Sequence, residues 1–136
     1  MSDADSASET KTAPGPAPGF ADHPAHNIDI APCPGRQRAL FGDDVIADSK
    51  RALIVREADY PPVIYFPRGD VNMALLQPTS HSSHCPFKGD ASYWSIAGGD
   101  GKSGENAAWS YQTPYDEMTA LKGHVAFYAD RVRAGP

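Results

Sequence analysis

The chain has 136 residues, a length typical of one domain, with 40% hydrophobic and 21% charged residues. Its net charge is −5, and no apolar run approaches the roughly 20 residues that a membrane span needs. These values argue against a membrane protein, and the lack of a basic stripe argues against nucleic acid as a partner.

The first 35 residues differ in composition from the rest. They hold one lysine against five acidic residues, a net charge of −4, together with 6 of the 13 prolines. Such a segment buries too little apolar surface to offset the entropy of ordering it. We therefore expect an acidic, Pro-rich, flexible N-terminal arm over residues 1–35, disordered over residues 1–20. Phe20, Ile28 and Ile30 are candidate anchors of an extended stretch that leads into a domain over residues 36–136.

The start of the chain lacks the basic residues and apolar stretch of a secretory signal, and it is too acidic for a mitochondrial transit peptide. Its two cysteines, Cys33 and Cys85, are too few for a disulfide framework. We therefore expect a cytoplasmic protein.

Short segments rich in β-branched and aromatic residues, separated by turns, follow from residue 36 onward. Their connections are too short for crossover helices, so the strands should pair antiparallel in a meander of hairpins. A Gly-rich hairpin loop is expected over residues 98–104. The expected strands cover residues 38–41, 45–47, 52–56, 63–66, 73–79, 91–96, 106–111 and 124–128.

One short α-helix is expected between the last two strands. Thr113 is a suitable N-cap, Pro114 suits the first helical position, and Asp116 favours the positive end of the helix. Lys122 and Gly123 are typical of its C-terminal end. The sequence therefore predicts an all-β, mainly antiparallel single domain with one short α-helix.

Several motifs occur in an order and spacing that resemble the bacterial family named Domain of Unknown Function 427, over roughly residues 36–132. They are Tyr65-Phe66-Pro67-Arg68-Gly69-Asp70-Val71, Cys85-Pro86-Phe87-Lys88-Gly89, Tyr93-Trp94, Trp109-Ser110-Tyr111 and Ala126-Phe127-Tyr128. The resemblance implies a β-tent-like fold of two antiparallel sheets, similar to methionine sulfoxide reductase B, Yippee proteins and the drug-binding domain of cereblon. The family carries a nucleotidyltransferase-type label without an established activity.

Neither the zinc nor the reductase activity of those relatives is implied for this chain. The relatives usually hold zinc with two CxxC-type pairs, and this sequence has neither pair nor the reductase's Arg-x-Cys-x-Asn pattern. We expect no cofactor and no metal. The alternative is a zinc site built from the arm and one loop, for which the available ligands are His23, His26, Cys33, His81, His84 and Cys85.

Cys85 and Lys88 are the candidate catalytic residues. A cysteine between a histidine and a nearby lysine has the surroundings of a reactive thiolate, with His84 or His124 as a base. Adjacent residues of an extended chain point to opposite faces, however, so His84 reaches the neighbouring sulfur only across a turn. The alternative is a small buried cysteine in a Pro-rich turn.

Arg68 and Asp70 are candidate ligand-binding residues at a strand end. A guanidinium there suits a carboxylate or phosphate, with Asp70 orienting it; the alternative is an internal ion pair between the two. Trp109 and Tyr111 lie two residues apart and so share one face, which is either packed core or the wall of a pocket. Tyr65 belongs to the same aromatic set, and Glu57 is a further candidate polar member.

Together these residues predict a domain that binds a small anionic molecule. Arg68, Asp70 and Lys88 form the polar floor of the expected pocket, and Tyr65, Trp109 and Tyr111 its aromatic part. Whether the pocket is catalytic stays open at this stage. The alternative is a protein-interaction module that uses the Pro-rich arm. The nearly neutral domain permits a homodimer without requiring one.

Overall fold

The computed structural model describes residues 15–97 and 104–136. Within these ranges the chain forms ten strands and four short helical segments. The strands are β1 (Ile28–Pro32), β2 (Gln37–Phe41), β3 (Asp44–Ser49), β4 (Leu53–Glu57), β5 (Val63–Pro67), β6 (Leu76–Cys85), β7 (Gly89–Ile96), β8 (Ala108–Ser110), β9 (His124–Phe127) and β10 (Arg133–Gly135). The helical segments are the α-helix α2 (Gly19–Asp22) and the 3-10 helices η1 (Arg68–Asp70), η2 (Met73–Leu75) and η3 (Asp116–Leu121). No helix in the described ranges is long and apolar enough to cross a bilayer.

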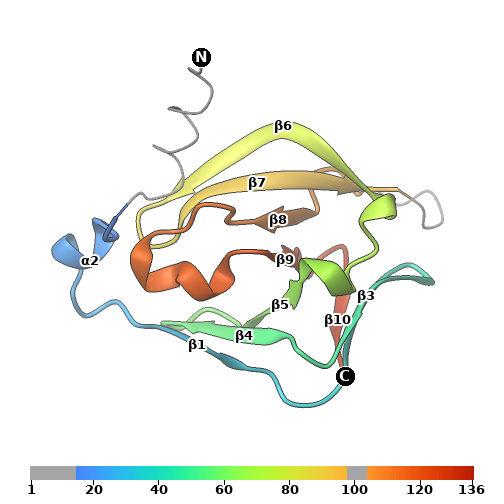
Figure 1. Ribbon diagram of the computed structural model, residues 1–136, viewed down its shortest axis with the longest axis horizontal. Coiled ribbons are helices and arrows are strands. Elements are labelled where there is room, and N and C mark those ends of the chain that lie inside the picture. The colour runs from blue at the N-terminus through green and yellow to red at the C-terminus, as the bar shows by residue number, and fades with distance from the viewer. Residues whose placement is uncertain (1–14, 98–103) are drawn as a thin grey trace.

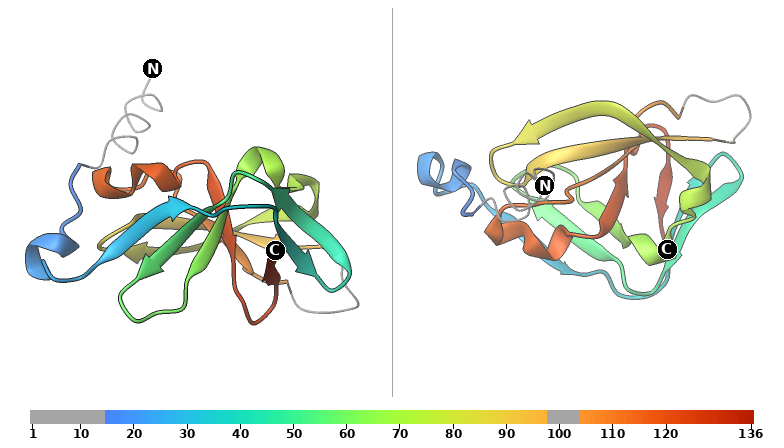
Figure 2. Two further views of the ribbon diagram at one scale, coloured as in Figure 1. Left: turned by 90° about the horizontal axis from the view of Figure 1, so that it is seen from below. Right: turned by 45° about the horizontal axis from the view of Figure 1, so that its top comes forward.

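The strands form two sheets in which every pairing is antiparallel. The larger sheet has seven strands in the order β1-β4-β5-β9-β8-β7-β6, and the smaller has three in the order β10-β2-β3 (Figure 1). Figure 2 shows the large sheet strongly curved, with the small sheet at one end. The predicted all-β, mainly antiparallel domain is confirmed, with the two sheets that the resemblance implies.

One face of the large sheet packs against the small sheet. Alternate residues of its strands, among them Phe66, Trp94 and Val125, form a single buried cluster with Phe41 and Ile46 of the small sheet. All five are at most 4% exposed. Side chains alternate between the faces of a strand, so the residues between these must point to the opposite face.

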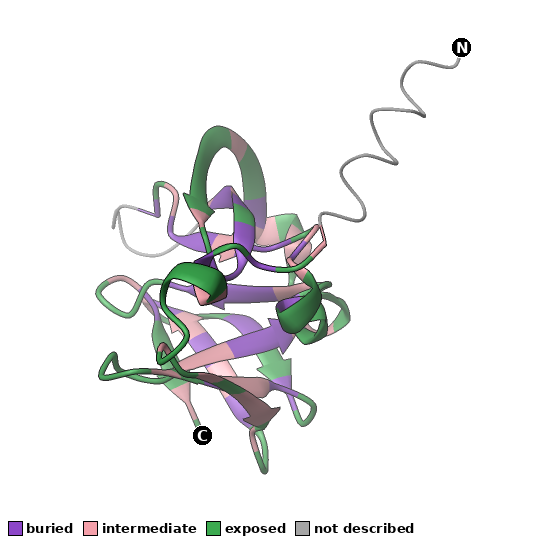
Figure 3. Cartoon of the chain, turned by 90° about the vertical axis from the view of Figure 1, so that its left-hand side faces the viewer, coloured by how far each residue is buried: buried purple, intermediate pink, exposed green. Residues whose placement is uncertain are grey.

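That opposite face carries a second, more aromatic cluster. Tyr65, Tyr93 and Tyr111 are its largest buried members, and Met118 and Leu121 of η3 cover part of it. Strand β6 lies at the edge of the sheet beside β7, and most of its residues are exposed along the arch at the top of Figure 3.

The helix expected after Thr113 forms, but as a 3-10 helix over Asp116–Leu121 rather than an α-helix. Thr113 makes no cap there; the residue before the helix is Tyr115, in an extended conformation, and no side chain caps it. Met118 departs from helical geometry, with φ −111° and ψ 18°. The kink has a packing reason: it leaves both Met118 and Leu121 buried within one short segment.

The N-terminal segment contributes to the fold from residue 15 onward. Strand β1 pairs with β4 along its whole length, so the large sheet begins before residue 36. The three expected anchors, Phe20, Ile28 and Ile30, all pack against the second cluster. Of the residues expected to be disordered (1–20) and of the expected hairpin loop (98–104), residues 1–14 and 98–103 lie outside the described residues. For residues 15–20 the expectation is wrong, because Ala17 is 5% exposed and Gly19 begins α2.

Candidate functional site

A cavity of about 290 Å³ opens on the aromatic face of the large sheet. Strands β4 and β5 supply two residues each, the β6–β7 turn supplies Lys88, and β8 and the residue after it supply Trp109 and Tyr111. The loop between β4 and β5 forms the remainder. The lining residues are Val55, Glu57, Tyr60, Pro61, Val63, Tyr65, Lys88, Trp109 and Tyr111.

Strand periodicity explains why these residues converge. Val55 and Glu57 are two apart on β4, Val63 and Tyr65 are two apart on β5, and each pair therefore points to one face. The same holds for Trp109 and Tyr111, whose shared face the sequence predicts. This face is both packed core and pocket wall, because Tyr111 is only 8% exposed and also lines the cavity.

Three charged or polar side chains form a chain of contacts that starts at one wall of the cavity, where Glu57 and Lys88 are lining residues, and ends at His26 outside the lining. The Lys88 ammonium donates to Oε1 of Glu57, and Nε2 of His26 lies 2.8 Å from Oε2 of the same carboxylate. The Lys88 side chain is 9% exposed and that of Glu57 19%. His26 is held in turn by stacking on Phe87, with 4.1 Å between the ring centroids.

These contacts decide the charge state of Glu57. Burial raises the pKa of its carboxyl group, since it penalises the charged form. The hydrogen bonds from Lys88 and His26 act in the opposite sense and prevail, so the pKa lies below its ordinary value. Glu57 is therefore ionised at neutral pH, with Lys88 as its nearest countercharge.

Two tyrosine hydroxyls belong to the same wall. Burial raises the pKa of Tyr65 far above its ordinary value, against the effect of the hydrogen bond that the indole Nε1 of Trp109 donates to it over 3.2 Å. Burial likewise raises the pKa of Tyr111, and the nearby Tyr65 and Cys85 add to the effect. Both hydroxyls are therefore neutral donors, and that of Tyr111 hydrogen-bonds to no residue within 15–97 or 104–136.

Cys85 lies at the end of β6, half-buried against the aromatic cluster. The two histidines considered as its base have other partners. Nδ1 of His84 lies 2.7 Å from Oδ1 of Asp90, and Nδ1 of His124 lies 3.0 Å from the carbonyl oxygen of Lys122. Lys88, the other candidate catalytic residue, contacts Glu57.

The structure separates Arg68 and Asp70 from this cavity and from each other. Asp70 accepts hydrogen bonds from the Ser49 hydroxyl (2.6 Å) and from Arg51 (3.2 Å). Arg68 instead packs over the indole of Trp94, with its guanidinium carbon 5.4 Å from the ring centroid. The expected polar floor therefore divides: Lys88 lies with Tyr65, Trp109 and Tyr111, whereas the other two residues line different hollows.

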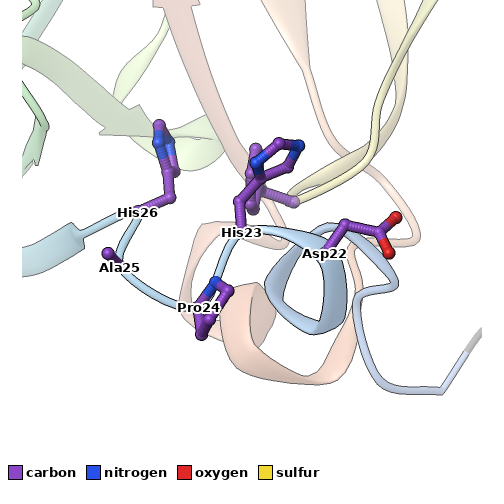
Figure 4. A pocket seen from close by; sticks show the side chains of 6 residues that line it. Asp22, His23, Pro24, Ala25 and His26 are labelled. Carbon is purple, nitrogen blue, oxygen red and sulfur yellow. The ribbon is translucent and has the colours of Figure 1, made fainter.

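The side chains considered for zinc lie apart. Among the residues that the structure describes, no three His, Cys, Asp or Glu side chains are grouped so as to hold a metal ion. Figure 4 shows His23 and His26 in the hollow beside α2, with their rings on the same side of the segment and Pro24 between them on the other. His26 uses Nε2 for Glu57, and His81 packs against Tyr93, with 4.4 Å between the ring centroids.

A family model described as a domain of unknown function (DUF427) matches residues 29–135. The chain belongs to the DUF427 family. The match begins within β1, ahead of the expected domain start, and it includes every residue that lines the aromatic cavity. A comparison with curated proteins finds no match to the chain.

Sequence reasoning missed four residues of the cavity lining, namely Val55, Tyr60, Pro61 and Val63. It also missed His26 as the neighbour of Glu57. His26 lies three residues before the region that matches the DUF427 family. Its contact with Glu57 depends on β1 pairing with β4, which brings Ile28 opposite Glu57. The alternation Ile28-Asp29-Ile30 is the signal in the sequence for that strand.

Proposed function

We propose that this protein binds a small molecule in the aromatic cavity, with an anionic or oxygen-rich group of the ligand received by Lys88. The observation that carries the proposal is the contact chain from Lys88 through Glu57 to His26, whose first two members line a cavity that also has four aromatic side chains. A buried, hydrogen-bonded charge beside apolar walls is the usual composition of a ligand site.

Lys88 supports the recognition of an acidic group. An ammonium has three N–H donors, and Glu57 accepts one of them, which leaves two for a ligand. Glu57 repels an anion nearby, and this repulsion grows with the charge that the ligand group carries. A carboxylate on the ligand is therefore better matched to this wall than a doubly charged group.

The aromatic side chains support a flat, compact partner. At about 290 Å³ the cavity is at the small end of the range for ligand sites, which favours a ligand of metabolite size. Trp109 and Tyr65 are fixed by their shared hydrogen bond, so little side-chain entropy is lost when a ring packs against them. The Tyr111 hydroxyl offers a further donor.

The two free cysteines support a reducing compartment, so the proposal places the protein in the bacterial cytoplasm. Catalysis by Cys85 or Lys88 remains a prediction from the sequence, and binding does not depend on it.

Thermal-shift screening with small aromatic carboxylates and their neutral amides tests the proposal. A ligand at a hundred times its Kd stabilises the folded state by about 2.7 kcal/mol, which raises the melting temperature by several degrees. We expect shifts with carboxylates that exceed those with the matched amides. Tyr111→Phe should weaken the shift for ligands that bear an acceptor, because it removes one donor without changing the shape of the wall.

Tyr115→Phe is the matched control. Tyr115 lies outside the cavity lining, and the one contact of its hydroxyl with the described part of the chain is a long one of 3.4 Å with His84. Equal thermal shifts of Tyr111→Phe and Tyr115→Phe would mean that the ligand binds outside the aromatic cavity. No response across the panel would contradict the proposal and favour the interaction module, which a pull-down with and without the N-terminal arm would then examine.

A further inference from the structure

A second, smaller pocket of about 200 Å³ lies where β5 and β8 end and β9 begins. Two of its side chains are cationic, one is an imidazole, and two are neutral hydrogen-bond donors. These five residues are Arg68, Ser110, Gln112, Lys122 and His124. Its lining contains no carboxylate.

The local fold brings these groups together from three distant parts of the chain. Pro67 pairs with His124 in the β5–β9 ladder, and the backbone N–H of Arg68 donates to the carbonyl oxygen of Gly123 over 2.8 Å. Gly123 has φ +76°, a left-handed conformation that turns the chain between η3 and β9. Arg68 therefore lies beside the turn that carries Lys122 and His124.

The cations of this pocket have no carboxylate partner within the described residues. Neither Arg68 nor Lys122 takes part in an ion pair there, whereas Arg36 and Arg51 do. The Arg68 guanidinium is held on one face by the indole of Trp94. Such stacking orients a guanidinium and leaves its N–H edges available to an acceptor.

Ser110 adds a hydroxyl group, without a protein partner in the described ranges, to the cationic side chains of the pocket. Its side chain lines the pocket, the residue is only 3% exposed, and its hydroxyl hydrogen-bonds to no residue in the part of the chain that the structure describes. Its oxygen is not among the fully buried polar atoms without a partner, which within the described residues are limited to Nε of Arg131, so the hydroxyl is accessible and can donate to a group bound in the pocket.

We propose that this pocket binds a phosphate group, with Arg68 and Lys122 as its cationic contacts and the Ser110 hydroxyl as a neutral donor. A tetrahedral oxyanion has enough acceptor oxygens for donors that converge from several elements, and guanidinium groups suit it well. Ser110 alternates with Trp109 and Tyr111 along the chain, so this site lies on the opposite face of the sheet from the aromatic cavity.

Amide chemical shifts measured during titration with inorganic phosphate and with methyl phosphate test the site, with sodium chloride added to keep the ionic strength constant. We expect saturable changes at Ser110, Gly123 and His124. Binding of both probes indicates recognition of the phosphate group itself, and tighter binding of methyl phosphate indicates a phosphomonoester as the natural group. Arg68→Ala should weaken binding by about tenfold or more, since it removes charged hydrogen bonds.

Arg133→Ala is the matched control, because Arg133 is an exposed arginine on β10 outside the pocket lining and should leave the affinity unchanged. Lys122→Ala is a second variant that does not disturb the packing on Trp94, and it should weaken binding several-fold. Linear shifts without saturation, or equal affinities in wild type and both pocket variants, would overturn the proposal. Tyr111→Phe should leave phosphate binding intact, because Tyr111 lies in the aromatic cavity. A failure of the proposed cavity function and a failure of the proposed phosphate site can therefore be told apart.

Discussion

Lys88 is the only charged side chain among the buried residues that the structure describes. Its buried charge is compensated by the carboxylate of Glu57. A buried ion pair gives little net stability relative to apolar side chains of the same volume, but the loss of one partner leaves the other uncompensated. We therefore expect that removing one partner lowers the free energy of unfolding much more than replacing both partners with apolar side chains.

Lys88→Met and Glu57→Gln should each lower the free energy of unfolding by about 3 kcal/mol, whereas the double variant Glu57→Leu with Lys88→Met should recover much of that loss. Urea denaturation of the four proteins measures the difference. Arg51→Met is the control, because the Arg51–Asp70 pair is exposed and should contribute about 0–1 kcal/mol. Single variants as stable as the control would mean that water solvates the Lys88–Glu57 pair.

At the scale of elements, the N-terminal segment is part of the site because it carries His26 to Glu57. It is fastened next to α2, where the Gly19 N–H donates to the Pro86 carbonyl oxygen over 2.9 Å. A Cβ at Gly19 would lie 2.8 Å from two ring carbons of Phe87 and 2.9 Å from that same oxygen. Only glycine allows this approach between the segment and the β6–β7 turn.

Gly19→Ala should therefore displace the segment, destabilise the fold by about 1–3 kcal/mol and weaken the contact of His26 with Glu57. The midpoint of urea unfolding and the imidazole chemical shifts of His26 measure the two effects. Gly69→Ala is the matched control, because nothing lies within 4 Å of a Cβ there. Equal stability of the two variants would show that the segment adapts without cost.

The sequence predicts most of the strands because their alternation and turns are local signals. Strand β1 was expected only as an extended stretch, since five residues among prolines have little tendency to pair until the edge of β4 is present. Strand β10 was not expected, because a three-residue strand at the chain end is formed by its pairing with β2 rather than by its own pattern. The 3-10 geometry of η3 likewise depends on what Met118 and Leu121 pack against.

For the site, the two-residue spacing of Trp109 and Tyr111 correctly predicts that they share one face, whereas Tyr65 joins them from another strand, which spacing does not indicate. Proximity in sequence is a poorer guide for Arg68 and Asp70. Both lie in η1, and a 3-10 helix has three residues per turn, so side chains two residues apart point in different directions. Asp70 therefore contacts Ser49 and Arg51, and Arg68 contacts Trp94. The spacing of these residues in the sequence does not indicate either set of contacts.

For the whole molecule, the large sheet separates two kinds of chemistry. Its aromatic face holds the cavity with the Lys88–Glu57 pair, and the other face, which packs on the small sheet, holds the basic pocket at its margin. Three carboxylates connect parts of the chain that are distant in sequence. Glu57 contacts the β6–β7 turn and the N-terminal segment, and Asp70 connects η1 to the β3–β4 region. Asp48 pairs with Arg36 beside β2.

The native contacts of these three carboxyl groups make the fold sensitive to acid. Hydrogen bonds from Ser49 and Arg36 lower the pKa values of Asp70 and Asp48, and those from Lys88 and His26 lower that of Glu57 despite its burial. A carboxyl group whose pKa is lower in the folded state contributes stability above its unfolded pKa and loses it as the pH falls through the folded value. For Glu57 the contribution is complete above its ordinary pKa of 4.5 and declines below it.

The free energy of unfolding should therefore fall as the pH is lowered from about 5 towards about 3, in the same direction for all three groups. Glu57→Gln should be less stable than wild type at neutral pH. The gap should narrow as the pH falls below 4.5, because Glu57 takes up a proton in the unfolded chain before it does so in the folded protein. Urea unfolding of both proteins across this range measures the gap. A gap of constant size at every pH would show that Glu57 stabilises the fold through its shape and hydrogen bonds rather than through its charge.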